Sequence, residues 1–354
     1  MTVASRPVGK VFWQLEAARG AAAAYIALSH IVGNQTSVPW IIRAALGFGQ
    51  EVVILFFLIS GFVIHWSVVH KPDMGFGAYL RARTLRIYPL FLLTLGLAAA
   101  IAHSHEPSDP RASLGTFFGN VLMLQDWGTI KPGVWVETYA GVLALWSLSY
   151  EWWFYMLYFP IAKKIPATAQ AGVVAAVSVS QALLYAWYPN QASRFLIYFC
   201  IWWVGVELAK ATINRMPLNL RTLRLPLGTV ALVTLVLAIG AWQWPASGRL
   251  LRAGTHPILE LRHFIAALGI TGIALVWHRF KWAGFKKLIG PFVFVAPWSY
   301  ALYVLHEPIG VHAKWFDFIP DHRLRIVLTL LLVSMSAWLA ERYFQTWCRR
   351  LLNQ

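Results

Sequence analysis

Arg19 and His30 are two ionisable residues that lie eleven positions apart in the first strongly apolar stretch of the chain. An α-helix turns about 100° per residue, so both side chains face the same way, about 16 Å apart along the axis. Ionisable groups are costly inside a membrane and usually face a bundle interior or a wet cavity where they have a function. A neutral imidazole can remove a hydroxyl proton near pH 7. The pair suggests a path from an anionic ligand to a reaction centre; the alternatives are a structural histidine and an arginine that reaches the membrane interface.

Arg83 and Arg86 form a second group of residues with possible chemistry. They lie three positions apart at the start of a later apolar stretch, so they share one face of a helix. Clustered guanidinium groups suit phosphate, because arginine binds it with two parallel hydrogen bonds. The alternatives are a topological signal and contacts with anionic lipid headgroups, and the spacing alone favours the topological role.

Two further apolar stretches carry ionisable side chains. Glu151 lies near the middle of one of them, where a carboxylate needs a partner such as Arg19, Arg262 or a histidine; a structural ion pair is the alternative reading. His306 lies in the other and is followed by Glu307. Hydroxyl groups near these positions are candidate donors to a reaction oxyanion: Ser147, Ser149, Tyr150, Ser299 and Tyr300.

The composition is that of an integral membrane protein. Of the 354 residues, 58% are hydrophobic and only 12% are charged. The net charge of +16 would suggest a nucleic-acid partner in a soluble protein, but here basic residues in loops explain it, so no nucleic acid is expected. The two cysteines, Cys200 and Cys348, are far apart in apolar stretches and indicate no disulfide framework.

The apolar stretches predict an all-α, polytopic bundle of about ten transmembrane helices. Ser60-Gly61 in the second helix is a small pair that allows another helix to approach closely. The tract 114–124 is too short to cross and is expected to be re-entrant or at the surface. The predicted spans are 14–33, 48–68, 87–103, 141–160, 170–188, 191–210, 226–244, 257–277, 290–311 and 324–345.

The distribution of Lys and Arg predicts that both ends of the chain face the cytosol. With this orientation the inner segments carry 18 of the 30 basic residues, the outer segments carry 7, and 5 lie in or at the ends of spans. Residues 1–354 are expected to form a single transmembrane domain with no appended soluble domain. The longest outer loop, 104–140, contains Trp127, Trp135 and Tyr139, which could stack on sugar rings or simply mark the interface.

Several motifs together resemble the acyltransferase 3 family of multi-spanning membrane acyltransferases. The matching segments, from about residue 13 to 347, include Arg19 with His30 and the stretches FFLISGF, RTLRIYP, WSLSYEWWFY, SYALYVLHEP and AERYF. The resemblance implies transfer of an acyl group, most often acetyl from acetyl-CoA, to a hydroxyl. Acceptors in such a family are commonly sugars of envelope or secreted polysaccharides, and the membrane is the bacterial inner membrane.

The resemblance also implies residue roles. Arg19 and His30 match the family's Arg-and-His signature, and Arg83 with Arg86 matches its paired-arginine signature, associated with coenzyme A. Glu341 matches a late glutamate thought to work with the first-helix histidine. Two departures from the family pattern are notable. Many relatives have an outer hydrolase-like domain, which is not expected here. The fourth-span motif of the family usually has two adjacent acidic residues, whereas Glu151 is followed by Trp152.

These observations predict a mechanism without a metal. His30 is the general base or a transient acyl carrier, and Glu341 or Glu151 orients it. Tyr150, Ser299 and His306 are possible accessory residues. The acceptor, a polysaccharide or lipid-linked sugar, is expected at the outer face, next to membrane lipids. A transporter or flippase for a lipid-linked sugar is the main alternative, a non-catalytic scaffold is another, and the oligomeric state is not indicated.

Overall fold

The computed structural model describes residues 6–105, 107–244 and 250–352, and these residues are almost entirely helical. The long helices, in chain order, are α1 (Arg6–Ile31), α3 (Gly49–Val69), α4 (Phe76–His105), α6 (Trp146–Lys164), α7 (Ala167–Trp187), α8 (Gln191–Ile213), α9 (Arg224–Gln243), α10 (Ile258–Arg279) and α13 (His322–Leu339). Shorter helices are α2 (Trp40–Ala45), α5 (Leu114–Val121), α11 (Phe285–Leu288), α12 (Ser299–Glu307) and α14 (Thr346–Leu352). One parallel pair of two-residue strands, β1 (Gln125–Asp126) and β2 (Val136–Glu137), lies in the long loop.

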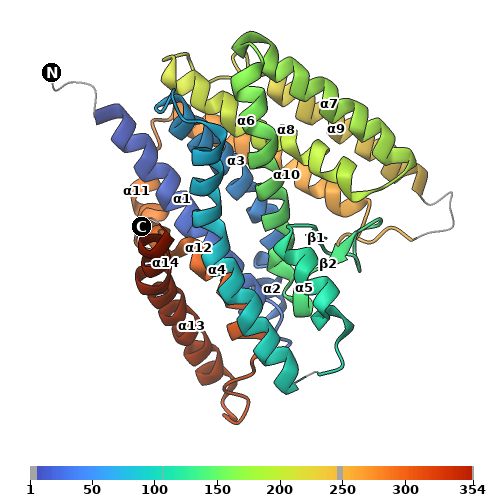
Figure 1. Cartoon of the computed structure of the whole chain (residues 1–354), viewed down its shortest axis with the longest axis vertical. Helices are drawn as coiled ribbons and strands as arrows, with labels where there is room; N and C mark the ends of the chain where they lie inside the picture. Colours follow the sequence, from blue (N-terminus) through green and yellow to red (C-terminus); the bar gives the residue numbers. More distant parts are fainter. Residues whose placement is uncertain (1–5, 106, 245–249, 353–354) are drawn as a thin grey trace.

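Short 3-10 and π segments connect several helices: η1 (Pro110–Ala112), η2 (Tyr139–Gly141), η3 (Leu143–Leu145), η5 (Gly290–Phe294), η6 (Ala296–Trp298), η7 (Pro308–His312) and η8 (Ala340–Gln345). In Figure 1 the long helices run side by side, with α13 and α14 along one side of the bundle and α7 and α9 along the other. The helices that will matter for function, α1, α3, α4, α6 and α12, lie between these two sides.

Within the described ranges, seven helical segments are long and apolar enough to cross a membrane. They confirm an all-α membrane protein, whereas the count of ten spans and the orientation remain predictions. The seven segments are Trp40–Val69, Phe76–His105, Ala167–Trp187, Gln191–Ile213, Arg224–Gln243, Ile258–Arg279 and His322–Leu352.

Most residues of every predicted span are helical, but three spans differ in shape from the prediction. Span 141–160 begins in η2 and η3, and α6 starts only at Trp146. Span 87–103 is the second half of a 30-residue helix, α4, which begins at Phe76 and contains Pro89. Span 290–311 is not one α-helix but the series η5, η6, α12 and η7. The prolines at the starts of η5, η6 and η7 explain these breaks, because proline cannot donate the backbone hydrogen bond that continues a helix.

Two glycines allow α3 and α8 to cross closely, as the Ser60-Gly61 pair predicts. A Cβ atom on Gly61 would collide with the carbonyl oxygen of Trp202, and one on Gly205 would collide with that of Leu58. Small residues let helix backbones approach in this way, and the resulting van der Waals contacts replace the hydrophobic effect that is absent inside a membrane. This crossing fixes the position of α3, which lines the candidate site described below.

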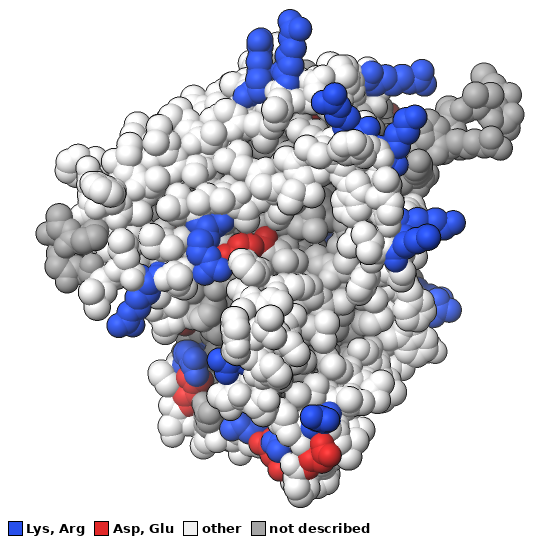
Figure 2. All heavy atoms as spheres, turned by 180° about the vertical axis from the view of Figure 1, so that it is seen from behind, with Lys and Arg blue, Asp and Glu red and all other residues white. Residues whose placement is uncertain are grey.

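The charged surface is uneven. Figure 2 shows Lys and Arg gathered toward the upper rim and both signs of charge near the lower rim, with a largely uncharged area between them that holds a few charged side chains, among them a basic and an acidic one side by side. Lipid tails can cover the uncharged part of this area without burying charged side chains. The upper rim also holds the connection between α6 and α7 (Figure 1), which the sequence predicts to be cytosolic.

Candidate functional site

A cavity of about 380 Å³ brings together the three arginines predicted to bind an anion, Arg19, Arg83 and Arg86. We call it the arginine cavity. Arg19 comes from α1 and the other two come from α4, so the juxtaposition depends on helix packing. Arg349 of α14 supplies a fourth guanidinium group. Other polar side chains that line the arginine cavity are Ser60, Ser147, Glu151, Tyr155, Ser299, Tyr300 and Tyr303.

The arginines retain unused hydrogen-bonding capacity beside this cavity. Arg19 donates one hydrogen bond from Nη2 to the carbonyl oxygen of Ala296, at 3.0 Å. The guanidinium carbon of Arg83 lies 5.6 Å from the ring centre of Tyr79. The Nε atoms of Arg19 and Arg83 are buried and have no hydrogen-bond partner among the described residues. Buried, unpaired cationic donors beside an open cavity favour an anionic ligand, because leaving them unpaired is costly.

Glu341 and Glu151, the carboxylates predicted to orient His30, have other partners in the structure. Glu341 pairs with Arg86, with 2.7 Å between Oε1 and Nη1. Glu151 accepts a hydrogen bond from Ser60 at 2.9 Å and another from the hydroxyl of Tyr155. These hydroxyls satisfy Glu151 in place of the arginine or histidine that we expected. Among the described residues, no hydrogen bond or ion pair joins either carboxylate to His30.

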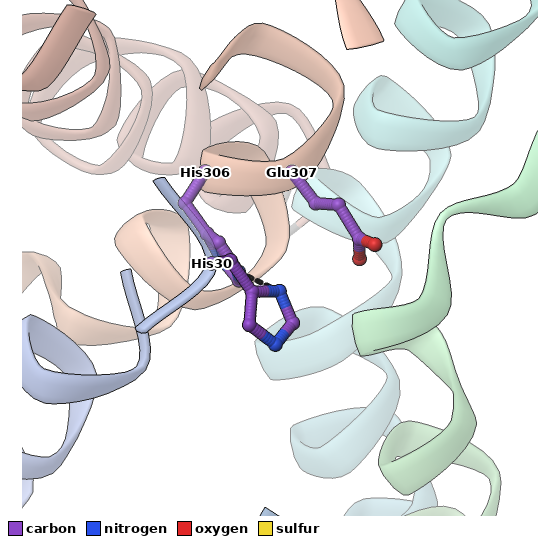
Figure 3. A group of neighbouring side chains, drawn as sticks. All are labelled: His30, His306 and Glu307. Atoms are coloured by element: carbon purple, nitrogen blue, oxygen red, sulfur yellow. Dashed lines mark hydrogen bonds between the residues drawn. The ribbon is translucent and has the colours of Figure 1, made fainter. Parts of the chain in front are cut away.

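His30 is instead paired with His306 of α12. The Nδ1 atom of His30 lies 3.1 Å from Nε2 of His306, and the ring centres are 4.9 Å apart. Figure 3 shows this hydrogen bond as a dashed line between the two rings, which are tilted by 58° to each other, with the carboxylate of Glu307 to one side. His306 is completely buried, whereas His30 is partly exposed. From the sequence, His306 was only a possible accessory residue. Its distance from His30 depends on how α12 packs against α1, which the sequence does not show.

The hydrogen bonds of His306 define which nitrogen of His30 is free. Nδ1 of His306 lies 2.8 Å from the carbonyl oxygen of Tyr303, and a carbonyl oxygen only accepts, so this Nδ1 donates. In the neutral ring, Nε2 of His306 then accepts a hydrogen bond from Nδ1–H of His30. The lone pair of a neutral His30 is therefore on Nε2. A Cβ atom added to Gly49 would lie 3.9 Å from this Nε2, so the free nitrogen faces the start of α3.

Glu307 completes a cluster of three titratable groups around His30. Its Oε2 accepts a 2.6 Å hydrogen bond from the backbone N–H of Ala144, and its Oε1 lies 3.9 Å from Nε2 of His312. One ligand atom from each of His30, His306 and Glu307 lies within 4.8 Å of the others, so the cluster could also hold a metal ion. Glu307 had no predicted role, and its position directly after His306 was the available signal.

His30 and Glu307 line a second cavity of about 230 Å³, which we call the histidine cavity. Trp127, one of the loop aromatics considered for sugar stacking, also lines it, together with the amide side chains of Asn34 and Gln50. Trp135 is instead largely exposed, and Tyr139 packs edge-on against Phe117. The remaining polar side chains of the histidine cavity are Ser29 and Arg43.

A buried ion cluster holds the loop that carries Trp127. Asp126 lies 2.7 Å from Nζ of Lys131 and 3.1 Å from Nε of Arg194, and all three side chains are fully buried. Burial raises the pKa of Asp126, but the two cations outweigh this effect and hold the pKa below its ordinary value. Asp126 also accepts hydrogen bonds from the backbone N–H of Trp127 and from the hydroxyl of Tyr150. Tyr150 is therefore part of this cluster and lines none of the cavities described here.

A third cavity, of about 20 Å³, lies between the other two. It shares Tyr303 with the arginine cavity, and it shares His30, Gln50 and Trp127 with the histidine cavity. The hydroxyl of Tyr303 donates to the carbonyl oxygen of Ala144 at 2.8 Å, which fixes the ring at the boundary. Ser299, the remaining accessory candidate, lines the arginine cavity and donates to the carbonyl oxygen of its neighbour Ala296.

Comparison with known proteins assigns the chain to a family. The acyltransferase 3 family model, described as an acyltransferase domain, matches residues 12–341, a range that contains every predicted site residue. Acyltransferase MdmB of Streptomyces mycarofaciens is 29% identical over 290 residues, which cover 73% of this chain and 67% of MdmB. No solved structure matches the chain significantly.

Proposed function

Since this chain belongs to the acyltransferase 3 family and is an acyltransferase, we propose that it moves an acetyl group from acetyl-CoA to a sugar hydroxyl. The acceptor is part of an envelope or secreted polysaccharide or a glycolipid, and the enzyme works in the bacterial inner membrane. The observation that carries this proposal is a series of three cavities that share lining residues, with the arginines around the first and His30 lining the other two. Family membership favours this activity over that of a transporter.

The arginine cavity suits the nucleotide end of the acyl donor. Coenzyme A is polyanionic, and Arg83 and Arg86 can bind its phosphates through pairs of charge-assisted hydrogen bonds. Arg19 offers a further cation, whose unpaired Nε is buried. The pantetheine arm then extends past Tyr303 toward His30, and the helix between Arg19 and His30, about 16 Å, is comparable with its length.

His30 acts as the general base in this proposal. Its Nε2 lone pair removes the proton of the acceptor hydroxyl, and the hydroxyl oxygen attacks the acyl carbon. The carbon–sulfur bond breaks, and the imidazolium returns the proton to the departing thiolate. His306 stabilises the required tautomer from the other side of the ring, and Glu307 supplies a nearby negative charge. If His30 instead carried the acyl group transiently, the same lone pair would attack the acyl carbon of the thioester.

The histidine cavity suits a sugar acceptor. Trp127 offers an apolar ring face, and Asn34 offers an amide group that can donate hydrogen bonds to sugar hydroxyls and accept hydrogen bonds from them. Because Trp127 belongs to the loop predicted to be outside, we place acceptor binding at the outer face. A lipid-linked sugar could reach this cavity from the surrounding membrane.

The activity is tested with the full chain purified in nanodiscs. We expect release of free thiol from acetyl-CoA only when an acceptor glycan is present, and mass spectrometry should find one acetyl ester per thiol released. A chelator should leave the rate unchanged, because the proposed chemistry needs no metal. Transport of the sugar without thiol release would contradict the proposal. If a chelator abolished the activity and added zinc restored it, the histidine cluster would be a metal site.

Replacing His306 should slow the reaction through His30 rather than through donor binding. We expect His306→Ala to lower kcat about 10- to 100-fold, the usual cost of losing a partner that orients a reactive group, with little change in the KM for acetyl-CoA. His306→Gln should restore part of kcat, because an amide oxygen can accept from Nδ1–H of His30. If the alanine variant keeps the wild-type kcat, or if glutamine is no better than alanine, His306 does not position His30.

A further inference from the structure

The 20 Å³ cavity between Tyr303 and His30 is the narrowest part of the proposed path. We propose that it is the acyl subsite, which holds the acyl group of the donor thioester and admits a chain of two carbons. This inference rests on the proposed function and deepens it. Tyr303 lines both this cavity and the arginine cavity, and His30 lines this cavity too, so a thioester that extends from the arginines to His30 places its acyl group here.

The size of this subsite limits the acyl chain. At about 20 Å³ this cavity is far smaller than the arginine cavity (about 380 Å³) and the histidine cavity (about 230 Å³), so a longer acyl chain has less room here than in either of them. The apolar part of the wall comes from three long helices, with Ile26 on α1, Val53 on α3 and Trp146 on α6. All three side chains are buried and form part of the core or pack against it. Close-packed side chains of this kind resist the outward movement that a longer acyl chain would require.

One polar group in this wall lacks a partner. The Oε1 atom of Gln50 is buried and forms no hydrogen bond with any described residue. Gln50 follows Gly49, and a Cβ atom on Gly49 would lie only 3.9 Å from Nε2 of His30. A flip of the side-chain amide exchanges its oxygen and nitrogen, so the unpartnered position can hold the N–H₂ group, which then donates to the thioester carbonyl. We therefore assign to Gln50 the donor that stabilises the negative charge on this oxygen as the acceptor attacks.

The reaction in the subsite is balanced without another reactant. The acceptor hydroxyl gives its proton to Nε2 of His30, its oxygen bonds to the acyl carbon, and charge develops on the carbonyl oxygen next to Gln50. The carbonyl then re-forms, the carbon–sulfur bond breaks, and His30 protonates the thiolate. The products are the acyl ester and the free thiol of coenzyme A.

Chain-length selectivity tests the subsite directly. Thiol release is measured with acetyl-, propionyl- and butyryl-CoA for the wild-type protein and for Val53→Ala. We expect the wild type to prefer acetyl over butyryl at least about tenfold in kcat/KM, and we expect Val53→Ala to reduce that preference about tenfold. Val68→Ala is the matched control: Val68 is also a buried valine of α3 but lines none of the cavities described here, so it should keep the wild-type preference.

Two further variants keep the test decisive. If Val53→Ala does not fold, Ile26→Val enlarges the same wall by one methylene and should shift selectivity toward propionyl. Gln50→Ala should lower kcat with acetyl-CoA about 10²-fold and change KM little, as expected for a donor to an oxyanion. Unchanged selectivity in the enlarged variants, or equal use of butyryl by the wild type, would overturn the subsite while the acyltransferase proposal stands. No thiol release from any donor would overturn the proposed function itself.

Discussion

Replacing His30 with alanine should reduce acyl transfer about 10²- to 10⁴-fold, the range for removal of a general base. Nε2 of His30 is the free lone pair at the junction of the histidine cavity and the acyl subsite, whereas His306 lines none of the cavities described here. The other histidine of the pair, His306, points its Nδ1 at the carbonyl oxygen of Tyr303. The measurement is the rate of acceptor-dependent thiol release from acetyl-CoA.

The KM for acetyl-CoA should change little in this variant, since the arginine cavity is untouched. His65→Ala is a suitable control for the loss of a buried histidine. His65 forms a 2.9 Å hydrogen bond with Tyr158 and lines none of the cavities described here. We expect that variant to retain most of its kcat. A His30→Ala protein that is folded and keeps more than about a tenth of the wild-type kcat would remove His30 from its proposed role.

Replacing Arg83 and Arg86 together with alanine should weaken binding of the acyl donor much more than it lowers kcat. A hydrogen bond to a charged group contributes about 1.5–3 kcal/mol, so each arginine should account for roughly a ten- to hundredfold increase in the KM for acetyl-CoA. The kcat at saturating donor should fall much less. S-acetylpantetheine, which lacks the nucleotide phosphates, should be used almost equally well by the variant and the wild type.

Arg81→Ala separates ligand binding from topology. Arg81 lies on the same helix but is exposed and does not line the arginine cavity, so this variant removes one inner positive charge and leaves the cavity intact. The KM of the Arg81→Ala variant for acetyl-CoA should equal that of the wild type. Because Arg86 pairs with Glu341, Arg86→Ala should also be measured in a Glu341→Gln background, where no carboxylate is left unpaired. If the Arg83/Arg86 double variant and the Arg81 variant had equal KM values for acetyl-CoA, Arg83 and Arg86 would only set the orientation of the chain in the membrane.

The order of the helices and the identity of the family could be predicted from the sequence. Whether an apolar stretch can cross a bilayer depends on its own length and hydrophobicity and not on the helices packed around it, so the positions of these stretches follow from the local sequence. The motif set predicts the acyltransferase 3 family, which the match over residues 12–341 confirms. The spacing of Arg19 and His30 follows from the geometry of one helix. These features depend on local sequence, and a single chain is enough to recognise them.

The partners of the reactive groups were decided by tertiary structure. From the sequence, Glu341 and Glu151 were the two carboxylates expected to orient His30, with no means of choosing between them, yet Glu341 binds Arg86 and Glu151 binds two hydroxyls. His306 takes that position because α12 packs against α1 and brings residues 276 positions apart within hydrogen-bond distance. The narrow cavity beside Gln50 likewise exists only where side chains of α1, α3 and α6 meet. Hydrogen bonds and cavities depend on distances of a few ångströms between helices, and periodicity along one helix does not contain that information.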